Sequence, residues 1–225
     1  MPGLPVEAGA FQPKLHILPA AQALLWPELS AVPGHFALYG GTGLALHLGH
    51  RQSADFDLFS EQGIDPDGLL RTIPFLRQAR VANIASNTLD VVVDRGAPVR
   101  VSFFGLPRLQ RLLPPYASPG NGLNVASLLD LAGTKAAVVQ QRSEMKDYLD
   151  VAAILADGRI SLPLALSAAR AIYGGQFNPQ ITLKALAYFG DGDLHALPAA
   201  PRQRLVEAVA STDPARLPLL ETSRP

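Results

Sequence analysis

A short apolar strand, a pair of glycines, a helix and a second strand follow one another directly in residues 35–59, and this order constrains the fold most. Residues 35–39 are apolar enough for a buried strand that ends at the glycines, and residues 42–48 suit a helix opening out of them. Residues 55–59 alternate polar and apolar side chains, as a half-buried strand does. The order predicts an α/β (α+β) fold whose glycine turn and second strand meet at one end of a small mixed sheet flanked by helices.

The glycine turn, Gly40-Gly41-Thr42, joins the predicted strand to the predicted helix. Backbone N–H groups at such a turn and the positive end of the helix dipole can face an anion such as a triphosphate. Glycine suits the position because, without a Cβ atom, it lets the backbone approach a ligand with unrestricted φ. We predict that Gly40, Gly41 and Thr42 bind the phosphates of a nucleotide. The alternative is a tight turn that only caps the helix.

Asp55 and Asp57 lie two residues apart on the second predicted strand, so their side chains leave the same face of the sheet. Two adjacent carboxylates repel each other, and a cation between them removes that cost. Hard oxygen ligands suit Mg²⁺ or Mn²⁺, which also bind phosphate oxygens of a substrate. The pair therefore predicts a divalent metal site. The alternative is a solvated edge strand that resists aggregation, with Arg51 paired to Asp55.

The rest of the chain divides into a part rich in predicted strands and a helical part. Further strands are expected at 81–85, 88–93 and 99–104, with a hairpin turn at Asp94-Arg95-Gly96. Helices are expected at 18–29, 65–79, 126–141, 146–156, 162–173, 182–189 and 201–210, and a linker at 108–122. The predicted domains are an α/β core at 15–107 and a helical C-terminal domain at 123–215 that contributes to the active site.

Composition narrows the function classes. The 225 residues are 48% hydrophobic and 17% charged, which is typical of a globular protein, and the formal net charge of zero gives no global case for a nucleic-acid or membrane partner. The absence of cysteine excludes disulfides and cysteine-based metal sites. Residues 1–14 are expected to be irregular, and no secretory signal or long apolar segment is visible, so the expected location is the cytoplasm.

Three blocks of this sequence together resemble the nucleotidyltransferase-fold toxins of the AbiEii/AbiGii type, which are relatives of the DNA polymerase β-like transferases. The first block contains Gly40-Gly41-Thr42, Leu46-His47-Leu48-Gly49-His50-Arg51 and Ser53-x-Asp55-Phe56-Asp57-Leu58-Phe59. The second contains Asp130-Leu131-Ala132, Lys135, Arg142 and Lys146-Asp147-x-x-Asp150, and the third runs from Phe177-Asn178-Pro179 to Leu186-x-Tyr188-Phe189. The resemblance spans about residues 18–210, most of the chain.

The resemblance implies transfer of a nucleoside monophosphate from a nucleoside triphosphate (NTP) to an acceptor hydroxyl. It places Asp55 and Asp57 at the metal site, and Lys135 where the family's lysine contacts the phosphates. Asp147 takes the place of a base or orienting group for the acceptor. It further implies that the acceptor is the 3′ end of a tRNA and that the protein is the toxin of a toxin–antitoxin pair.

Arg142 follows Lys135 by seven residues and is expected on nearly the same helix face, as a further nucleotide-binding residue. The alternative for Lys146, Asp147 and Asp150 is structural. Carboxylates in the first turn of a helix favour its dipole, and Lys146 and Asp150 have the spacing of an i,i+4 ion pair.

The predicted site departs from the family's relatives in one respect. Polymerase β-like enzymes place a third carboxylate on a later strand, and residues 99–104 contain no acid. Either Asp90 or Asp147 supplies the third group, or two carboxylates suffice. His35, His47 and His50 are potential metal ligands, and His47 and His50 lie three residues apart. No third ligand at a spacing suited to zinc accompanies that pair.

Two further functions remain open beside transfer to tRNA. The same site could modify a protein or a small molecule, or the protein could be a nucleotide-binding module without catalysis. The neutral charge does not itself support RNA binding, which needs clustered basic side chains. Such a cluster could come from Arg51, Arg71, Arg77, Arg80 and Arg100 if the fold gathers them.

Overall fold

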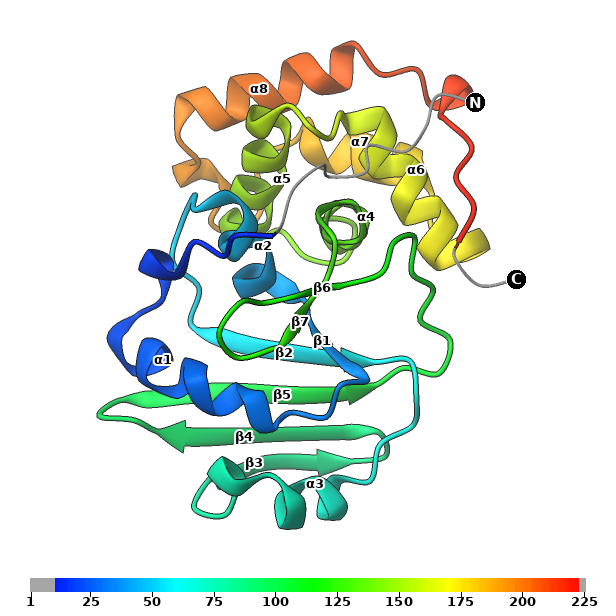
Figure 1. Ribbon diagram of the computed structural model, residues 1–225. Helices are drawn as coiled ribbons and strands as arrows, with labels where there is room; N and C mark the ends of the chain where they lie inside the picture. Colours follow the sequence, from blue (N-terminus) through cyan, green and yellow to red (C-terminus); the bar gives the residue numbers. More distant parts are fainter. Residues whose placement is uncertain (1–10, 223–225) are drawn as a thin grey trace. The chain divides into compact units, whose positions relative to one another are not determined.

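The computed structural model describes residues 11–222; residues 1–10, part of the segment expected to be irregular, lie outside the described residues. Contacts within the chain divide it into two compact units. The sheet unit comprises Phe11–Leu109 and Pro115–Ser127, and the helical unit comprises Gln110–Pro114 and the chain from Leu128 onward. Figure 1 shows the elements of each unit.

A mixed sheet organises the sheet unit (Figure 1), and the described part of the chain contributes seven strands to it in the order β3-β4-β5-β2-β1-β7-β6. The strands are β1 (Phe36–Leu38), β2 (Asp55–Ser60), β3 (Arg80–Ala85), β4 (Thr88–Asp94), β5 (Pro98–Gly105), β6 (Tyr116–Ala117) and β7 (Asn124–Val125). β2 is antiparallel to β1 and parallel to β5, and β1 is parallel to β7. The expected α/β class with a mixed sheet is confirmed.

The core of the sheet unit lies on one face of the sheet. Phe56 and Leu58 of β2 point to this face, and the alternating apolar residues of β4 and β5 extend it. The helix α1 (Ala20–Leu25) and the 3-10 turn after it, Trp26–Ala31, cover this face. Figure 1 shows α1 crossing in front of β5. The opposite face is left for Asp55 and Asp57.

Two expected helices are shorter than the sequence pattern indicated, and proline is the reason in each. The first ends as an α-helix at Leu25, and the chain continues as a 3-10 turn, Trp26–Ala31, in which Pro27 is the second residue. The second, α3 (Pro66–Thr72), ends because Ile73 precedes Pro74 and is extended, with φ −86° and ψ 115°.

The hairpin between β4 and β5 forms at the expected turn. Gly96 has a φ of +83°, and its N–H donates to the Asp94 side chain at 2.8 Å. The guanidinium of Arg95 binds the carboxylate of Glu28 through Nε at 2.6 Å and Nη2 at 2.7 Å. This pair ties the hairpin to the segment that follows α1.

The helical unit is built around α4 (Leu128–Val138), which is buried along almost its whole length. Around it lie α5 (Met145–Asp157), α6 (Leu162–Tyr173), α7 (Pro179–Leu186) and α8 (Ala199–Ala210). The close approach of α4 to α6 requires Gly133, because a Cβ atom there would lie 2.9 Å from the backbone of Ala168 and of Ala169. None of the described helices has the length and apolar character needed to cross a membrane.

The segment between the strand-rich and helical parts differs from the expected linker and helix. β6 and β7 form within and just after the expected linker, and α4 begins at Leu128, two residues later than expected. The carboxylate of Asp130 accepts the backbone N–H groups of Leu112 at 2.9 Å and Leu113 at 3.2 Å, which holds the segment 110–114 in the helical unit.

Candidate active site

The glycine turn and the aspartate strand lie in direct contact in the sheet unit. The backbone N–H of Tyr39, the last residue before the turn, donates to the carbonyl of Asp57 at 2.8 Å. Gly40 has a φ of +66°, and a Cβ atom at this position would collide with Oδ2 of Asp57 and lie 3.1 Å from its Cγ. A side chain on residue 40 is therefore excluded both by the left-handed backbone and by the carboxylate beside it.

Asp55 and Asp57 occupy the face of β2 opposite the core. Asp55 is exposed and Asp57 is half-buried, whereas Phe56 and Leu58 between and beyond them are fully buried. Alternation along the strand therefore brings both carboxylates to one face, as the sequence predicted. A divalent cation fits such a pair because Mg²⁺ is bound by one or two carboxylates and completes its shell with water and substrate oxygens.

The first turn of α2 (Gly40–Leu48) presents its backbone rather than its side chains. The Thr42 side chain is fully buried and its hydroxyl donates to the carbonyl of Asp55 at 2.5 Å. This bond fastens the helix start to β2. The N–H of Gly43 donates to the carbonyl of Tyr39 at 3.0 Å, so the backbone N–H groups of Gly40, Gly41 and Thr42 are the ones suited to face an anion.

Two side chains that the sequence did not assign to nucleotide binding lie over Gly41. A Cβ atom on Gly41 would lie 2.7 Å from Nη2 of Arg51 and 2.8 Å from Oγ of Ser53. Both residues belong to the connection between α2 and β2, and Arg51 Nη1 donates to the carbonyl of Gln52 at 2.9 Å. A guanidinium and a hydroxyl beside a glycine turn are suitable donors for a phosphate. Their position just before the aspartate pair is the signal that could have identified them.

The sheet does not bring a third carboxylate beside Asp55 and Asp57. The residue paired with Asp57 on the neighbouring strand β5 is Ser102, and Asp90 follows one strand further, on β4, paired with Ser102. The carboxylate of Asp90 accepts the Asn83 side-chain amide at 3.3 Å. Over residues 11–222 no group of three or more His, Cys, Asp or Glu side chains is arranged to hold a metal ion.

His47 packs within the sheet unit. Its ring is buried, contacts the carbonyl of Ala126 through Nε2 at 2.9 Å, and lies 4.6 Å from the ring of Phe11 between centroids. His35 packs against Phe36 with a centroid distance of 4.5 Å. These contacts give both histidines a structural role.

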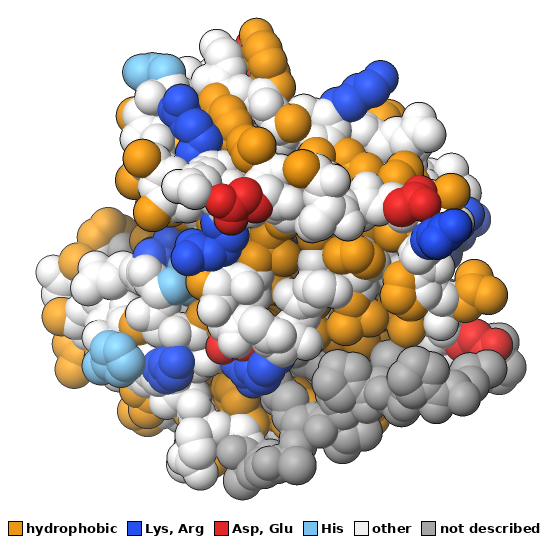
Figure 2. Space-filling view, turned by 90° about the horizontal axis from the view of Figure 1, so that it is seen from above, with side chains coloured by type: hydrophobic (Ala, Val, Ile, Leu, Met, Phe, Trp, Pro, Cys, Tyr) orange, Lys and Arg blue, Asp and Glu red, His pale blue; other side chains and the backbone are white. Residues whose placement is uncertain are grey.

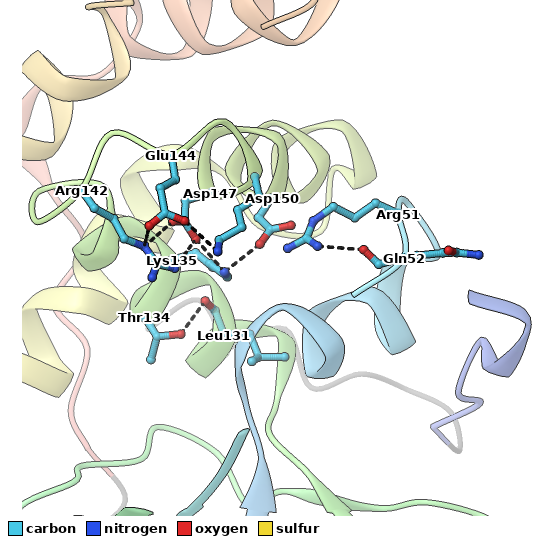
Figure 3. A network of polar contacts seen from close by, with 10 residues as sticks. Arg51, Gln52, Leu131, Thr134, Lys135, Arg142, Glu144, Asp147 and Asp150 are labelled. Carbon is cyan, nitrogen blue, oxygen red and sulfur yellow. Dashed lines mark hydrogen bonds and ion pairs between the residues drawn. The ribbon is translucent and has the colours of Figure 1, made fainter. Parts of the chain in front are cut away.

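The second sequence block forms a buried ionic network in the helical unit (Figure 3). Nζ of Lys135 on α4 lies 2.9 Å from Oδ1 of Asp147 and 2.7 Å from Oδ2 of Asp150, both on α5. The side chain of Lys135 is 7% exposed, and both carboxylates are completely buried. Two carboxylates thus explain why a lysine lies in an otherwise apolar helix.

Arg142 joins this network from a different element than expected. The helix α4 ends at Val138, so Arg142 is not on its face and the prediction from helical spacing was wrong. Instead Arg142 lies before α5 and binds Asp147 through Nε at 2.7 Å and Nη2 at 3.2 Å. Lys146 lies 2.7 Å from Glu144, and Glu144 also lies 3.5 Å from Arg142.

The network keeps Asp147 ionised. Burial raises the pKa of this carboxyl, but the hydrogen bonds from Arg142 and Lys135 and their positive charges outweigh burial. The resulting pKa lies below the ordinary value of an aspartate.

The five arginines that could have formed a basic cluster lie on several different elements. Arg71 is on α3, Arg80 on β3 and Arg100 on β5. The helix α3 packs on the core face of the sheet, the face of Phe56, through its buried residue Leu69. On the face drawn in Figure 2, Lys and Arg side chains stand in separate places, with Asp and Glu side chains among them.

The fold is that of nucleotidyltransferases. It is similar to a protein from H. pylori assigned as a nucleotidyltransferase, with a TM-score of 0.51 and 14% identity, covering 84% of this chain and 92% of the other. It is also similar to MenT4, a nucleotidyltransferase toxin from Mycobacterium tuberculosis H37Rv, with a TM-score of 0.56 and 16% identity, covering 86% and 82% of the two chains. At these identities the likeness concerns the fold alone.

The family follows from the sequence model of the nucleotidyl transferase AbiEii toxins of type IV toxin–antitoxin systems, which matches residues 24–222. The chain belongs to this family, as the resemblance in its motifs indicated. It is also 34% identical over 118 residues to the uncharacterised protein aq_aa25 of Aquifex aeolicus (strain VF5), covering 52% of this chain and 55% of that protein. The match thus spans about half the length of this relative.

Proposed function

We propose that this protein transfers a nucleoside monophosphate from an NTP to an acceptor hydroxyl, with release of pyrophosphate, in a reaction that needs Mg²⁺ or Mn²⁺. The observation that supports it most directly is the contact between the glycine turn and the aspartate strand. Gly40 has no side chain at a place where a Cβ atom would displace the carboxylate of Asp57. A phosphate-binding turn and a metal-binding carboxylate are thereby held side by side.

Each group in the sheet unit has a distinct role in the proposal. Asp55 and Asp57 would hold the metal ion, which when bound would neutralise charge on the phosphates of the NTP. The backbone N–H groups of Gly40, Gly41 and Thr42 would bind the phosphates that leave as pyrophosphate. Thr42 contributes through its backbone, because its hydroxyl is engaged with the Asp55 carbonyl.

Lys135, Arg142 and Asp147 are proposed catalytic-site residues because they match the family's second motif block. Lys135 would stabilise charge on the phosphates, and Asp147 would orient or deprotonate the acceptor hydroxyl. The depressed pKa of Asp147 supports a carboxylate that stays ionised at neutral pH. Removing one partner of these ion pairs would leave a buried charge uncompensated, so a test of catalysis must measure folding as well.

The acceptor and the partner are part of the proposal. The resemblance of the motifs suggests the 3′ end of a tRNA as acceptor, and membership in a type IV toxin–antitoxin family supports an antitoxin protein as partner. The second candidate is a nucleotide-binding module without turnover. It is favoured by one observation: within residues 11–222 no third carboxylate joins Asp55 and Asp57 in a metal-holding group.

The test is to incubate the purified protein with Mg²⁺, each α-labelled NTP in turn, and either total tRNA or a protein pool. An Asp57→Asn variant serves as the control. We expect label on tRNA that disappears with the variant. Label on protein would reject the tRNA acceptor, whereas tight NTP binding without transfer to either pool would reject the transferase activity in favour of the binding module.

A further inference from the structure

Arg100 lies next to the aspartate pair on the same face of the sheet. The parallel register of β2 and β5 pairs Asp55 with Arg100 and Asp57 with Ser102. Val99 and Val101, on either side of Arg100, are buried in the core, so Arg100 points to the face of the two aspartates. Neighbouring strands are about 4.8 Å apart, which places the Arg100 backbone one strand spacing from that of Asp55.

The guanidinium of Arg100 is presented to solvent. Its side chain is 56% exposed, and Nη2 lies 4.0 Å from Oδ2 of Asp90, at the limit of an ion pair. Asp90 is itself held from the other side by the Asn83 amide at 3.3 Å. Asp90 therefore steadies Arg100 weakly from β4 while the guanidinium keeps its capacity to bind a phosphate, whose oxygens it matches in a bidentate manner.

The strand order places Arg100 on the side of the aspartate pair that is opposite the glycine turn. The glycine turn follows β1, the aspartates are on β2, and Arg100 is on β5, in the spatial order β1-β2-β5. In phosphoryl transfer the attacking and leaving oxygens are roughly in line through the phosphorus atom. If the glycine turn on the β1 side binds the leaving pyrophosphate, the acceptor approaches from the β5 side.

We infer that Arg100 binds a backbone phosphate of a polynucleotide acceptor. The inference rests on the proposed function, because it needs the glycine turn to hold the leaving group. Ser102, at the adjacent position, adds no charge to this side of the aspartates.

The test measures RNA binding and catalysis separately in the full chain. Binding of a 5′-fluorescein-labelled RNA oligonucleotide with a single-stranded 3′ end is followed by anisotropy at several salt concentrations, for Arg100→Ala, Arg100→Lys and Arg71→Ala. Arg71 is a matched control because it is an arginine of the same unit whose side chain is 71% exposed and pairs with Asp65 at 3.6 Å. Thermal unfolding confirms that each variant is folded.

We expect Arg100→Ala to weaken RNA binding about tenfold and to lower the salt dependence by about one phosphate contact, with Arg71→Ala unchanged. Arg100→Lys keeps the charge without the bidentate geometry and should lie between them. In the transfer assay, KM for RNA should rise while KM for the NTP stays constant.

Three outcomes would overturn the inference: RNA that does not bind the wild-type chain, RNA binding unaffected by both Arg100 variants, or an increase in KM for the NTP alone. Failure of the proposed function has a different signature. It would appear as Arg100-dependent RNA binding without any transfer of label, which would leave the phosphate-binding role of Arg100 standing.

Discussion

The carboxylate of Asp57 lies against the α-carbon of Gly40, so that a single methyl group on residue 40 would collide with Oδ2. This contact joins the two parts of the first sequence block, the glycine turn and the strand with Asp55 and Asp57. The glycine does not only permit a left-handed backbone with a φ of +66°; it also leaves the space that the Asp57 side chain occupies. The contact makes the turn and the carboxylate interdependent, which leads to the first prediction.

Gly40→Ala should lower stability and abolish nucleotide binding. The left-handed backbone alone costs a non-glycine residue about 1–2 kcal/mol, and the methyl group would in addition push Asp57 out of position. Urea unfolding measures the first effect, and calorimetric titration with an NTP measures the second. Gly34→Ala is the control, since a Cβ there has nothing within 4 Å. Equal behaviour of the two variants would contradict the role given to Gly40.

Asp57→Asn should weaken Mg²⁺-dependent NTP binding by about a hundredfold or more without loss of stability. The amide keeps the shape of the side chain and removes the repulsion with the carboxylate of Asp55. The measurement is the thermal shift produced by NTP with and without Mg²⁺. Asp67→Asn provides the control, because Asp67 is exposed in the first turn of α3. A shift that survives in Asp57→Asn would exclude this carboxylate as a metal ligand.

Lys135→Met should destabilise the protein by about 3–5 kcal/mol, because it leaves two buried carboxylates facing each other with one cation removed. Adding Asp150→Asn to this variant removes the carboxylate that lost its cation and keeps the pair between Arg142 and Asp147. The double variant should therefore recover part of the stability. Transfer activity should stay lost in the double variant if Lys135 acts in catalysis. Recovery of both stability and activity would show that Lys135 is only structural.

Stability should fall in acid through Asp147. Its pKa in the folded protein is lowered, so the ionised carboxylate stabilises the fold at every pH above the unfolded pKa of about 3.9. That contribution is lost as the pH falls below about 4 and through the folded pKa. Urea unfolding between pH 2.5 and 7 should therefore show a shallower acid slope for Asp147→Asn than for the wild type. Identical slopes would show that the network does not depress this pKa.

Local sequence patterns predicted those elements of the sheet unit whose conformation depends on a few consecutive residues. The strand with Asp55 and Asp57, the glycine turn and the Asp94-Arg95-Gly96 hairpin were all predicted, because side-chain alternation and positive φ are properties of a few consecutive residues. The predictions were poorest around prolines and short strands. Pro74 ended a helix early, and β6 and β7, of two residues each, are too short to show any periodicity.

In the candidate site, too, local features were predicted and contacts between separate elements were not. The resemblance assigned Lys135 to the phosphates, but its partners Asp147 and Asp150 could be identified only from the packing of α5 on α4. Arg142 was expected on α4, whereas the helix ends before it and the side chain reaches Asp147 from the following segment. Ion pairs between separate elements depend on where those elements pack, and chain spacing does not report that.

By itself, the sequence determined that a glycine turn joins a strand to a helix and that Asp55 and Asp57 share a face, since both follow from local backbone geometry. The motifs also determined the family, to which residues 24–222 match. Only the tertiary structure decided that β5 lies beside β2, which puts Arg100 opposite Asp55 and Ser102 opposite Asp57. Strand pairing is long-range: the whole core selects the neighbour, because each strand must bury its apolar face against the same set of residues.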